Sequence, residues 1–292
     1  MKLAIGTAQF GLSYGISNKH GQTSLKEIKE ILKTTKKYNI NLIDTASLYG
    51  QSEEILGKCL NKDNSFKIIT KTPYFNGPEI TSQDIIQLRT TVTTSLKKLN
   101  QKSIYGILIH NTDNLFLKNG ELLLKELKKL KNESLVKKIG FSIYSPHQID
   151  SLLDSFEFDI IQIPINILDQ RLLIDGHLKK LKKSKIEIHA RSIFLQGLLL
   201  MPLNEIPSFF KPIYNKLKEY HNKIRYNNIT PLQAAIGFIK KIKEIDYIII
   251  GINNKQQLTE NINAYKEKIK KIDFKKFACF NEQIINPTNW KL

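Results

Sequence analysis

The stretch Asn41-Leu42-Ile43-Asp44-Thr45-Ala46-Ser47-Leu48-Tyr49-Gly50 passes from apolar to polar residues at Asp44. The same change occurs in Lys67–Thr72 and in Ile104–His110. A short apolar run bounded by polar residues is typical of a buried β-strand. Each stretch is therefore expected to place a polar side chain where a strand ends and a loop begins.

Short apolar runs of this kind recur along the whole chain. They are Leu3–Gly6, Asn41–Ile43, Lys67–Thr70, Ile104–Ile109, Lys137–Phe141, Ile160–Ile163, Ile186–Ala190 and Tyr247–Ile250. Runs rich in Ile, Leu and Val are typical of parallel strands buried on both faces. Because helical patterns fill the intervals, we predict an α/β fold, a (β/α)8 TIM barrel formed by a single domain over residues 1–292. A doubly wound sheet is the alternative, but repeat units of about 30 to 40 residues suit barrel closure better.

Several helix starts are marked by their capping residues. Ser24-x-x-Glu27 and Thr81-x-x-Asp84 resemble capping boxes, and Pro146 and Pro231 stand where a first helical residue is expected. One connection, between Ile193 and Thr230, is too long for a simple turn. It predicts an inserted helix around Ile213–Ile224, in a loop after strand seven on the catalytic face of a barrel.

Composition excludes several classes of protein. The chain has 292 residues and a formal net charge of +18, but its lysines are scattered near acids and accompany no nucleic-acid motif. We therefore expect no nucleic-acid partner. No run of 18 apolar residues occurs, so we expect no membrane span. Cys59 and Cys279 fit neither a disulfide framework nor a metal site, and no signal peptide is recognised, which favours the cytoplasm.

Four polar groups are expected to meet at one end of such a barrel. Asp44, Lys71 and His110 end strands two, three and four, and Tyr49 follows five residues after Asp44. A buried ammonium beside a phenol would lower the phenol's pKa from about 10, and a carboxylate would orient that ammonium. An imidazole could hydrogen-bond a substrate oxygen. The set predicts a proton donor aimed at a carbonyl group, which carbonyl reduction requires.

With these residues in place, the chain resembles the aldo-keto reductase family over nearly its whole length. The matching segments are Gly6–Gly11, Asp44-Thr45-Ala46-x-x-Tyr49-Gly50, Lys71, Leu108–His110, Ile139–Ser142, Ile161–Asn166, Gln196–Leu199, Ile250–Gly251 and Gln257-Leu258-x-x-Asn261. The resemblance implies NAD(P)H-dependent reduction of an aldehyde or ketone. It also implies that Asp44, Tyr49, Lys71 and His110 form a catalytic tetrad in which Tyr49 is the general acid.

The resemblance further implies where the cofactor is bound. Ser142 and Gln162 match positions that hold the nicotinamide carboxamide, and Ser192 lies in the segment that meets the pyrophosphate. At the other end, Gly251 closes the last strand, and Glu260 and Asn261 match positions around the adenine.

Three positions depart from the family pattern. Ile143 replaces an asparagine, and Arg191 stands where an aromatic residue often stacks on the nicotinamide. Gln257 replaces the arginine expected at the 2′-phosphate of NADPH, although the nearby Lys255 could substitute as a point charge. We therefore expect NADPH as the cofactor with NADH also possible.

Two alternatives to a carbonyl reductase remain open at this stage. One is a non-catalytic barrel that binds nucleotide as a sensor or subunit, and the other is a different barrel enzyme such as a lyase or epimerase. The intact tetrad argues against the first, and the missing metal-ligand clusters argue against the second. The resemblance implies a small-molecule carbonyl substrate, with a keto-sugar as one candidate. The sequence gives neither the oligomeric state nor the physiological direction of the reaction.

Overall fold

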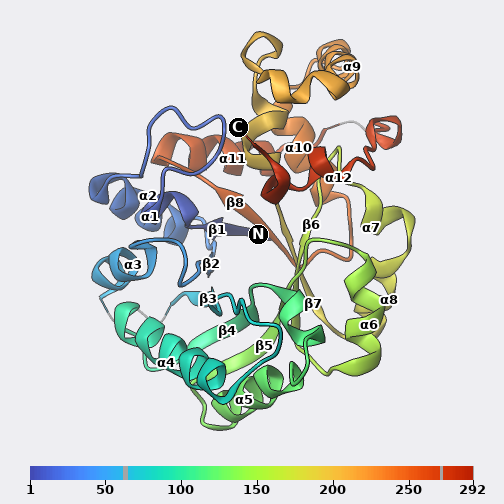
Figure 1. Ribbon diagram of the computed structural model, residues 1–292. Helices are drawn as coiled ribbons and strands as arrows, with labels where there is room; N and C mark the ends of the chain where they lie inside the picture. Colours follow the sequence, from blue (N-terminus) through green and yellow to red (C-terminus); the bar gives the residue numbers. More distant parts are fainter. Residues whose placement is uncertain (62–64, 270–271, 292) are drawn as a thin grey trace.

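The computed structural model describes residues 1–61, 65–269 and 272–291, and its strands form a closed barrel (Figure 1). Within these residues, eight parallel strands pair in chain order, and β8 closes the barrel against β1. The strands are β1 Leu3–Gly6, β2 Leu42–Asp44, β3 Lys67–Lys71, β4 Ile104–Ile109, β5 Val136–Ser142, β6 Ile160–Pro164, β7 Glu187–Arg191 and β8 Tyr247–Gly251. The predicted (β/α)8 barrel is confirmed, and each predicted strand end lies within one residue of the observed one.

Helices surround the strands in Figure 1. They are α1 Ala8–Gly11, α2 Leu25–Lys37, α3 Ser52–Leu60, α4 Ser82–Lys98, α5 Glu121–Asn132, α6 His147–Ser155, α7 Arg171–Ile174, α8 His177–Lys183, α9 Tyr214–Tyr226, α10 Pro231–Lys240, α11 Lys255–Lys266 and α12 Glu282–Ile285. Pro146 is the N-cap of α6 and not its first residue, so that helix starts one position later than predicted. Over the three described ranges, no helix has the length and apolar character needed to cross a membrane.

The two predicted capping boxes differ in the structure. At α4 the box is complete: Asp84 donates its backbone N–H to Thr81 Oγ1 at 3.3 Å, and its carboxylate accepts from the backbone N–H of Thr81 at 2.8 Å. At α2, Ser24 caps the helix, but the carboxylate of Glu27 instead accepts the backbone N–H of Lys255 at 3.0 Å. Glu27 therefore ties the start of α2 to the start of α11.

Side chains inside the barrel form layers, because successive residues of a strand point to opposite faces. One apolar layer consists of Ala4, Leu42, Ile69, Leu108, Ile160 and Ile249. Two residues further along the same strands stand Gly6, Asp44, Lys71, His110, Gln162 and Gly251, and all six line one cavity. The alternation of the strands thus places a polar layer at the mouth of the barrel, directly above the apolar one.

The opposite end of the barrel is closed by a polar cluster around Glu187. Its carboxylate accepts hydrogen bonds from Lys138 at 2.6 Å, from Tyr105 at 2.8 Å and from His189 Nε2 at 2.7 Å. His189 is fully buried here and packs against Tyr247, with ring centroids 5.1 Å apart. This histidine follows the apolar run of strand seven in the sequence, yet it lies among the floor residues and outside the cavity at the mouth.

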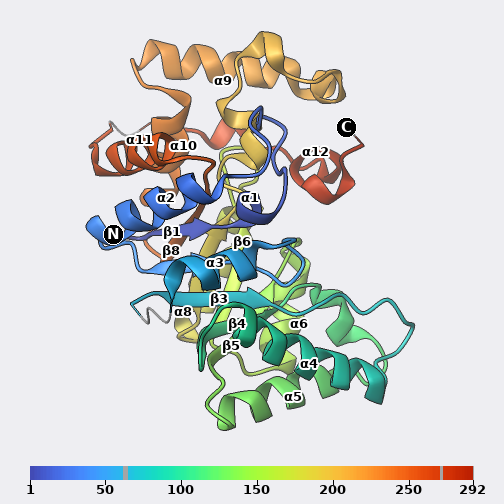
Figure 2. The ribbon, with the colours of Figure 1, turned by 90° about the vertical axis from the view of Figure 1, so that its left-hand side faces the viewer.

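The long connection between β7 and α10 contains three 3-10 turns, η2 Leu195–Leu200, η3 Leu203–Glu205 and η4 Ser208–Ile213, followed by α9. The predicted inserted helix is confirmed as α9, which lies outside the ring of strands, on the far side of α10, in both Figure 1 and Figure 2. This insert packs on the C-terminal part of the chain, and the rings of Phe210 and Trp290 have centroids 4.9 Å apart. A second hydrophobic cluster therefore holds the insert against the segments that follow β6 and β7.

We predict that Glu187→Gln destabilises the protein by about 1–3 kcal/mol at pH 7, because charged hydrogen bonds are lost. Burial alone would raise the pKa of Glu187, but hydrogen bonds from His189, Lys138 and Tyr105 outweigh burial and hold that pKa at about 2. The stabilisation is present above the unfolded pKa of about 4.3 and is lost as pH falls toward the folded value. Urea unfolding should therefore show that the parent and the variant converge between pH 5 and pH 2.

A matched control is Glu219→Gln, because Glu219 pairs with Lys276 on the surface, where both side chains are more than half exposed. That control should change stability by less than about 0.5 kcal/mol. A gap between parent and Glu187→Gln that stays constant down to pH 2 would contradict the assigned network.

Candidate active site

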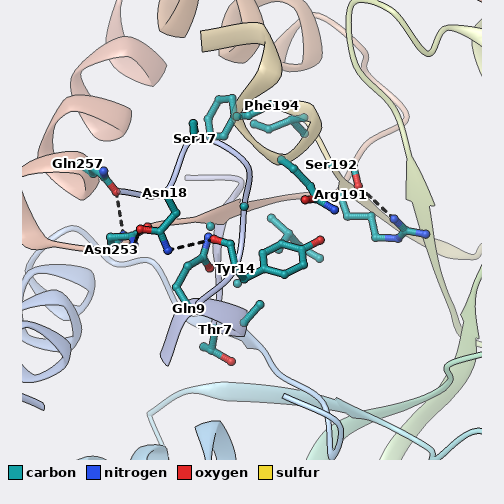
Figure 3. A pocket seen from close by; sticks show the side chains of 18 of the residues that line it. Thr7, Gln9, Tyr14, Ser17, Asn18, Arg191, Ser192, Phe194, Asn253 and Gln257 are labelled. Carbon is teal, nitrogen blue, oxygen red and sulfur yellow. Dashed lines mark hydrogen bonds between the residues drawn. The ribbon is translucent and has the colours of Figure 1, made fainter. Parts of the chain in front are cut away.

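One cavity of about 510 Å³ opens at the carboxyl ends of the strands (Figure 3). It brings together the four catalytic candidates and seven of the eight cofactor candidates. The lining residues among them are Asp44, Tyr49, Lys71, His110, Ser142, Gln162, Ser192, Gly251, Gln257, Glu260 and Asn261. Tyr14 and Tyr144, which follow β1 and β5, also line it.

Lys71 is held in a buried ion pair at the centre of this cavity. Its ammonium donates to Asp44 Oδ2 at 2.8 Å and to the carbonyl of Thr45 at 2.9 Å. The other oxygen of Asp44 accepts the side-chain amide of Gln162 at 2.7 Å. The Lys71 and Asp44 side chains are 1% and 5% exposed, so both charges are withdrawn from water and fixed by directional contacts.

Tyr49 lies beside this pair, with the Lys71 ammonium 5.0 Å from its ring centroid. Burial raises the pKa of the Tyr49 phenol, and the charge of Asp44 raises that pKa further. This differs from the expectation that Lys71 lowers the pKa. The reason is geometric, because the charge of Lys71 is matched by Asp44 at 2.8 Å. Tyr49 is therefore a protonated phenol, the form that can donate a proton.

The loop that carries Tyr49 is seated on α1 by a close backbone approach. A Cβ atom on Gly11 would lie 1.8 Å from the carbonyl oxygen of Tyr49, so no larger residue fits at position 11. Gly50 has a φ of +55°, a left-handed conformation that favours glycine. Ser52 Oγ also donates to the carbonyl of Thr7 at 3.0 Å. These contacts fix the height at which the phenol enters the cavity.

His110 completes the group on the other side of Tyr49. The two ring centroids are 6.1 Å apart at 81°, and the ring of Tyr74 packs on His110 at 4.9 Å. Burial, followed by the charges of Lys71 and Arg191, lowers the pKa of His110 to about 3. The imidazole is therefore neutral near pH 7. Its Nδ1 is buried and has no hydrogen-bond partner among the described residues.

The cofactor candidates lie at two ends of the cavity. Near the ion pair, Ser142 and Gln162 stand on neighbouring strands in direct register. At the far end, Asn261 lines the cavity, and its buried Oδ1 has no partner within the described part of the chain. Gly251 keeps the wall open, since a Cβ atom there would lie 2.6 Å from Gln9 Nε2. The buried ion pair near one end and the unpartnered Asn261 Oδ1 near the other give the cavity polar groups that suit a nicotinamide cofactor.

The structure places Lys255 away from this cavity. Its ammonium pairs with Glu30 on α2 at 3.1 Å, and it is absent from the cavity wall. Lys19 and His20, on the loop after β1, line the cavity instead. The ammonium of Lys19 pairs with Glu205 at 2.6 Å.

The loop after β1 contributes a group of lining residues that the sequence analysis did not single out. Its Ile16 donates a backbone N–H to the carbonyl of Gln196 at 3.1 Å, and Asn18 accepts from Asn253 at 2.8 Å. Figure 3 shows Asn18, Asn253 and Gln257 together at one side of the cavity. The loop therefore spans the cavity between the β7 and β8 connections. Its residues carry no periodic pattern that would reveal this role.

We predict that His110 stays neutral from pH 8 down to pH 4.5, so its imidazole NMR signals should not move over that range. The reason is its folded pKa of about 3, against about 6.5 for an unfolded histidine. Assignment comes from the loss of those signals in His110→Gln. The same chain unfolded in urea is the control, and its histidine signals should titrate near pH 6.5. A folded-state midpoint between pH 5 and pH 7 would contradict the described burial.

Comparisons with known proteins agree with this geometry. Two curated relatives are similar in sequence. The chain is 28% identical over 234 residues to the aldo-keto reductase YhdN of Bacillus subtilis, a match that covers 78% of this chain and 69% of the relative. It is 32% identical over 126 residues to D-arabinose 1-dehydrogenase of Saccharomyces cerevisiae, covering 40% of this chain but 36% of that relative.

Solved structures share the fold. The aldo-keto reductase AKR11C1 of Bacillus halodurans, in its holo form, matches with a TM-score of 0.73 at 19% identity, covering 92% of this chain and 88% of that one. A putative aldo-keto reductase of Pseudomonas aeruginosa, PA4992, matches with a TM-score of 0.67 at 21% identity, covering 90% and 89%. A sequence model of the Aldo/keto reductase family matches residues 2–282. With the barrel and the grouped tetrad, this match over almost the whole chain shows that the protein belongs to the aldo/keto reductase family of oxidoreductase enzymes.

Proposed function

We propose that the protein reduces an aldehyde or ketone to an alcohol with a nicotinamide cofactor, and that Tyr49 is the general acid. The proposal rests on the protonation states of three side chains that line one cavity. Tyr49 is a protonated phenol, Lys71 is a charged ammonium fixed by Asp44, and His110 is a neutral imidazole. This set can supply a proton to a carbonyl oxygen without changing the protonation of any other group.

The bound nicotinamide would supply the hydride that adds to the carbonyl carbon. Tyr49 would donate its phenolic proton to the carbonyl oxygen, which completes the alcohol. The phenolate that remains is stabilised by the ammonium of Lys71, 5.0 Å from the ring centroid. A neutral His110 can donate one N–H to the same oxygen and so orient the carbonyl. In the oxidation direction, Tyr49 would take the proton back.

The cofactor would be held by the residues at the two ends of the cavity. We propose Ser142 and Gln162 for the nicotinamide amide, and Ser192 for the pyrophosphate. For the adenosine end we propose Gly251, Gln257, Glu260 and Asn261. Lys255 drops out of this proposal, because Glu30 holds its ammonium outside the cavity.

A sugar carbonyl is the candidate substrate. The match to an enzyme named D-arabinose 1-dehydrogenase, at 32% identity over 126 residues, supports a sugar as the substrate class. A screen of small aldehydes, ketones and sugars with NADPH and with NADH would find the first substrate.

We predict that Tyr49→Phe lowers turnover by about 10²–10⁴-fold, the range typical of a lost general acid. Cofactor affinity should stay within about threefold of the parent, since Phe removes a single hydroxyl and keeps the ring beside the Lys71 ammonium. The measurement is steady-state reduction of a substrate that the parent accepts, together with fluorescence titration of the cofactor. Tyr74→Phe is the matched control, because Tyr74 packs on His110 but lies outside the cavity wall, and it should retain activity. Near-normal turnover by Tyr49→Phe would refute the assignment.

We predict that the dissociation constants for NADPH and NADH lie within about tenfold of each other. A charged contact to the 2′-phosphate would be worth roughly 10- to 150-fold, and the neutral Gln257 provides none. Lys255→Ala should leave the ratio of the two constants unchanged. Lys19→Ala is the companion variant, because Lys19 does line the cavity. Titrations at fixed ionic strength test this, and a thousandfold preference would mean that the adenosine end is misplaced.

A further inference from the structure

Arg191 is the last residue of β7, and its guanidinium lies in the cavity wall. Among the described residues, its hydrogen-bond partners are all neutral. Its Nη2 donates to the carbonyl of Ile143 at 2.8 Å, and its Nη1 donates to Ser192 Oγ at 3.0 Å. The guanidinium carbon lies 4.3 Å from the ring centroid of Tyr144. These contacts orient the planar group but leave its positive charge uncompensated.

Carboxylates of the cavity wall are engaged elsewhere. Asp44 is occupied by Lys71 and Gln162. Glu260 lies at the adenosine end, where its carboxylate accepts from Gln256 at 2.9 Å. No ion pair forms between Arg191 and any carboxylate within residues 1–61, 65–269 and 272–291. The cavity therefore holds a cation whose counter-charge the described chain does not supply.

The choice of arginine at this position is informative. The chain has 45 Lys and Arg residues, and four of them are Arg. Two of the other three each donate two N–H groups to a single carboxylate, Arg89 to Glu133 and Arg171 to Asp169. In this lysine-rich chain, two of the four guanidinium groups thus bind a planar oxyanion in a forked contact, a geometry that lysine cannot provide.

Arg191 lies at the end of the cavity where the substrate carbonyl is proposed to bind. Its charge lowers the pKa of His110 and opposes the rise in the pKa of Tyr14 and Tyr49, so it lies within electrostatic reach of all three. In Figure 3, Arg191 and Tyr14 lie at one end of the cavity, and Gln257 and Asn253 lie at the other. An anion bound by Arg191 would be near the group that donates the proton.

We infer that the substrate carries an oxyanion group, a carboxylate or a phosphate, and that Arg191 binds it while Tyr49 and His110 face the carbonyl. This inference rests on the proposed carbonyl reduction. It narrows the substrate class to acidic or phosphorylated aldehydes, ketones and sugars. Arg191 is then a specificity-determining residue. An uncharged sugar would be a poorer substrate than a sugar that carries a carboxylate or a phosphate.

Binding of product analogues tests the inference without requiring turnover. The probes are 4-(hydroxymethyl)benzoate, 4-(hydroxymethyl)phenyl phosphate and the uncharged methyl 4-(hydroxymethyl)benzoate, each titrated into the full chain by calorimetry at fixed ionic strength. The parent should bind one or both anions roughly 10- to 150-fold more tightly than the ester. Arg191→Gln should remove that difference and leave the affinity for the ester within about threefold. Arg191→Lys should keep part of it, because the charge remains but the fork is lost.

Each outcome decides the question. Equal binding of anions and ester by the parent overturns the inference. A loss of NADPH and NADH affinity in Arg191→Gln equal to the loss of anion affinity also overturns it, because Arg191 would then bind the cofactor. The carboxylate and phosphate arms identify which oxyanion is preferred. Reduction of 4-formylbenzoate is measured separately, so that Arg191-dependent binding without any turnover would reject the proposed function and leave the oxyanion site standing.

Discussion

The ammonium of Lys71 and the carboxylate of Asp44 are 2.8 Å apart, in a position that water hardly reaches. Withdrawing two charges from water costs several kcal/mol per ion, and the cost is recovered only when geometry and further hydrogen bonds are good. Here Thr45, directly after β2, and Gln162 on β6 supply those hydrogen bonds. Removing one partner of such a pair typically costs about 3–5 kcal/mol, so the two charges must be kept together. The pair holds strands two, three and six in one arrangement at the mouth of the barrel.

The same pair determines the state of its neighbours. Because Asp44 matches the charge of Lys71, the phenol of Tyr49 feels burial more than attraction and keeps its proton. Lys71 still disfavours a second positive charge nearby, which helps to keep His110 neutral. Burial beside one compensated ion pair therefore gives a protonated phenol and a neutral imidazole side by side. In the proposed reaction, Tyr49 would donate its proton, and Lys71 would stabilise the phenolate that remains.

Much of this arrangement could be predicted from the sequence, because it follows strand alternation. Apolar runs located the eight strands, and the first polar residue after three of them gave Asp44, Lys71 and His110. The same alternation places His189, inside β7, with the floor residues around Glu187.

What could not be predicted depends on contacts between distant segments. Lys255 seemed suited to a phosphate, but Glu30, 225 residues away in the chain, turns its ammonium outward. The raised pKa of Tyr49 depends on burial, which no local pattern records. Asn18 and Lys19 lie in a loop without a periodic sequence pattern, so their position at the cavity depends on the path of that loop in the folded structure. Sequence patterns thus identify residues that strands hold in place. They do not identify residues whose positions depend on loop conformation or on the contacts of long side chains.

The close approach between Gly11 and the carbonyl of Tyr49 limits how this enzyme can change. A Cβ atom at position 11 would sit 1.8 Å from that oxygen, so the two segments can vary only if they move together. The loop that carries Tyr49 is therefore locked to α1 through its backbone. Substitutions in α1 are therefore constrained by the requirements of the loop that carries Tyr49. A variant library that randomises residues 45–50 must keep glycine at position 11 to yield active members.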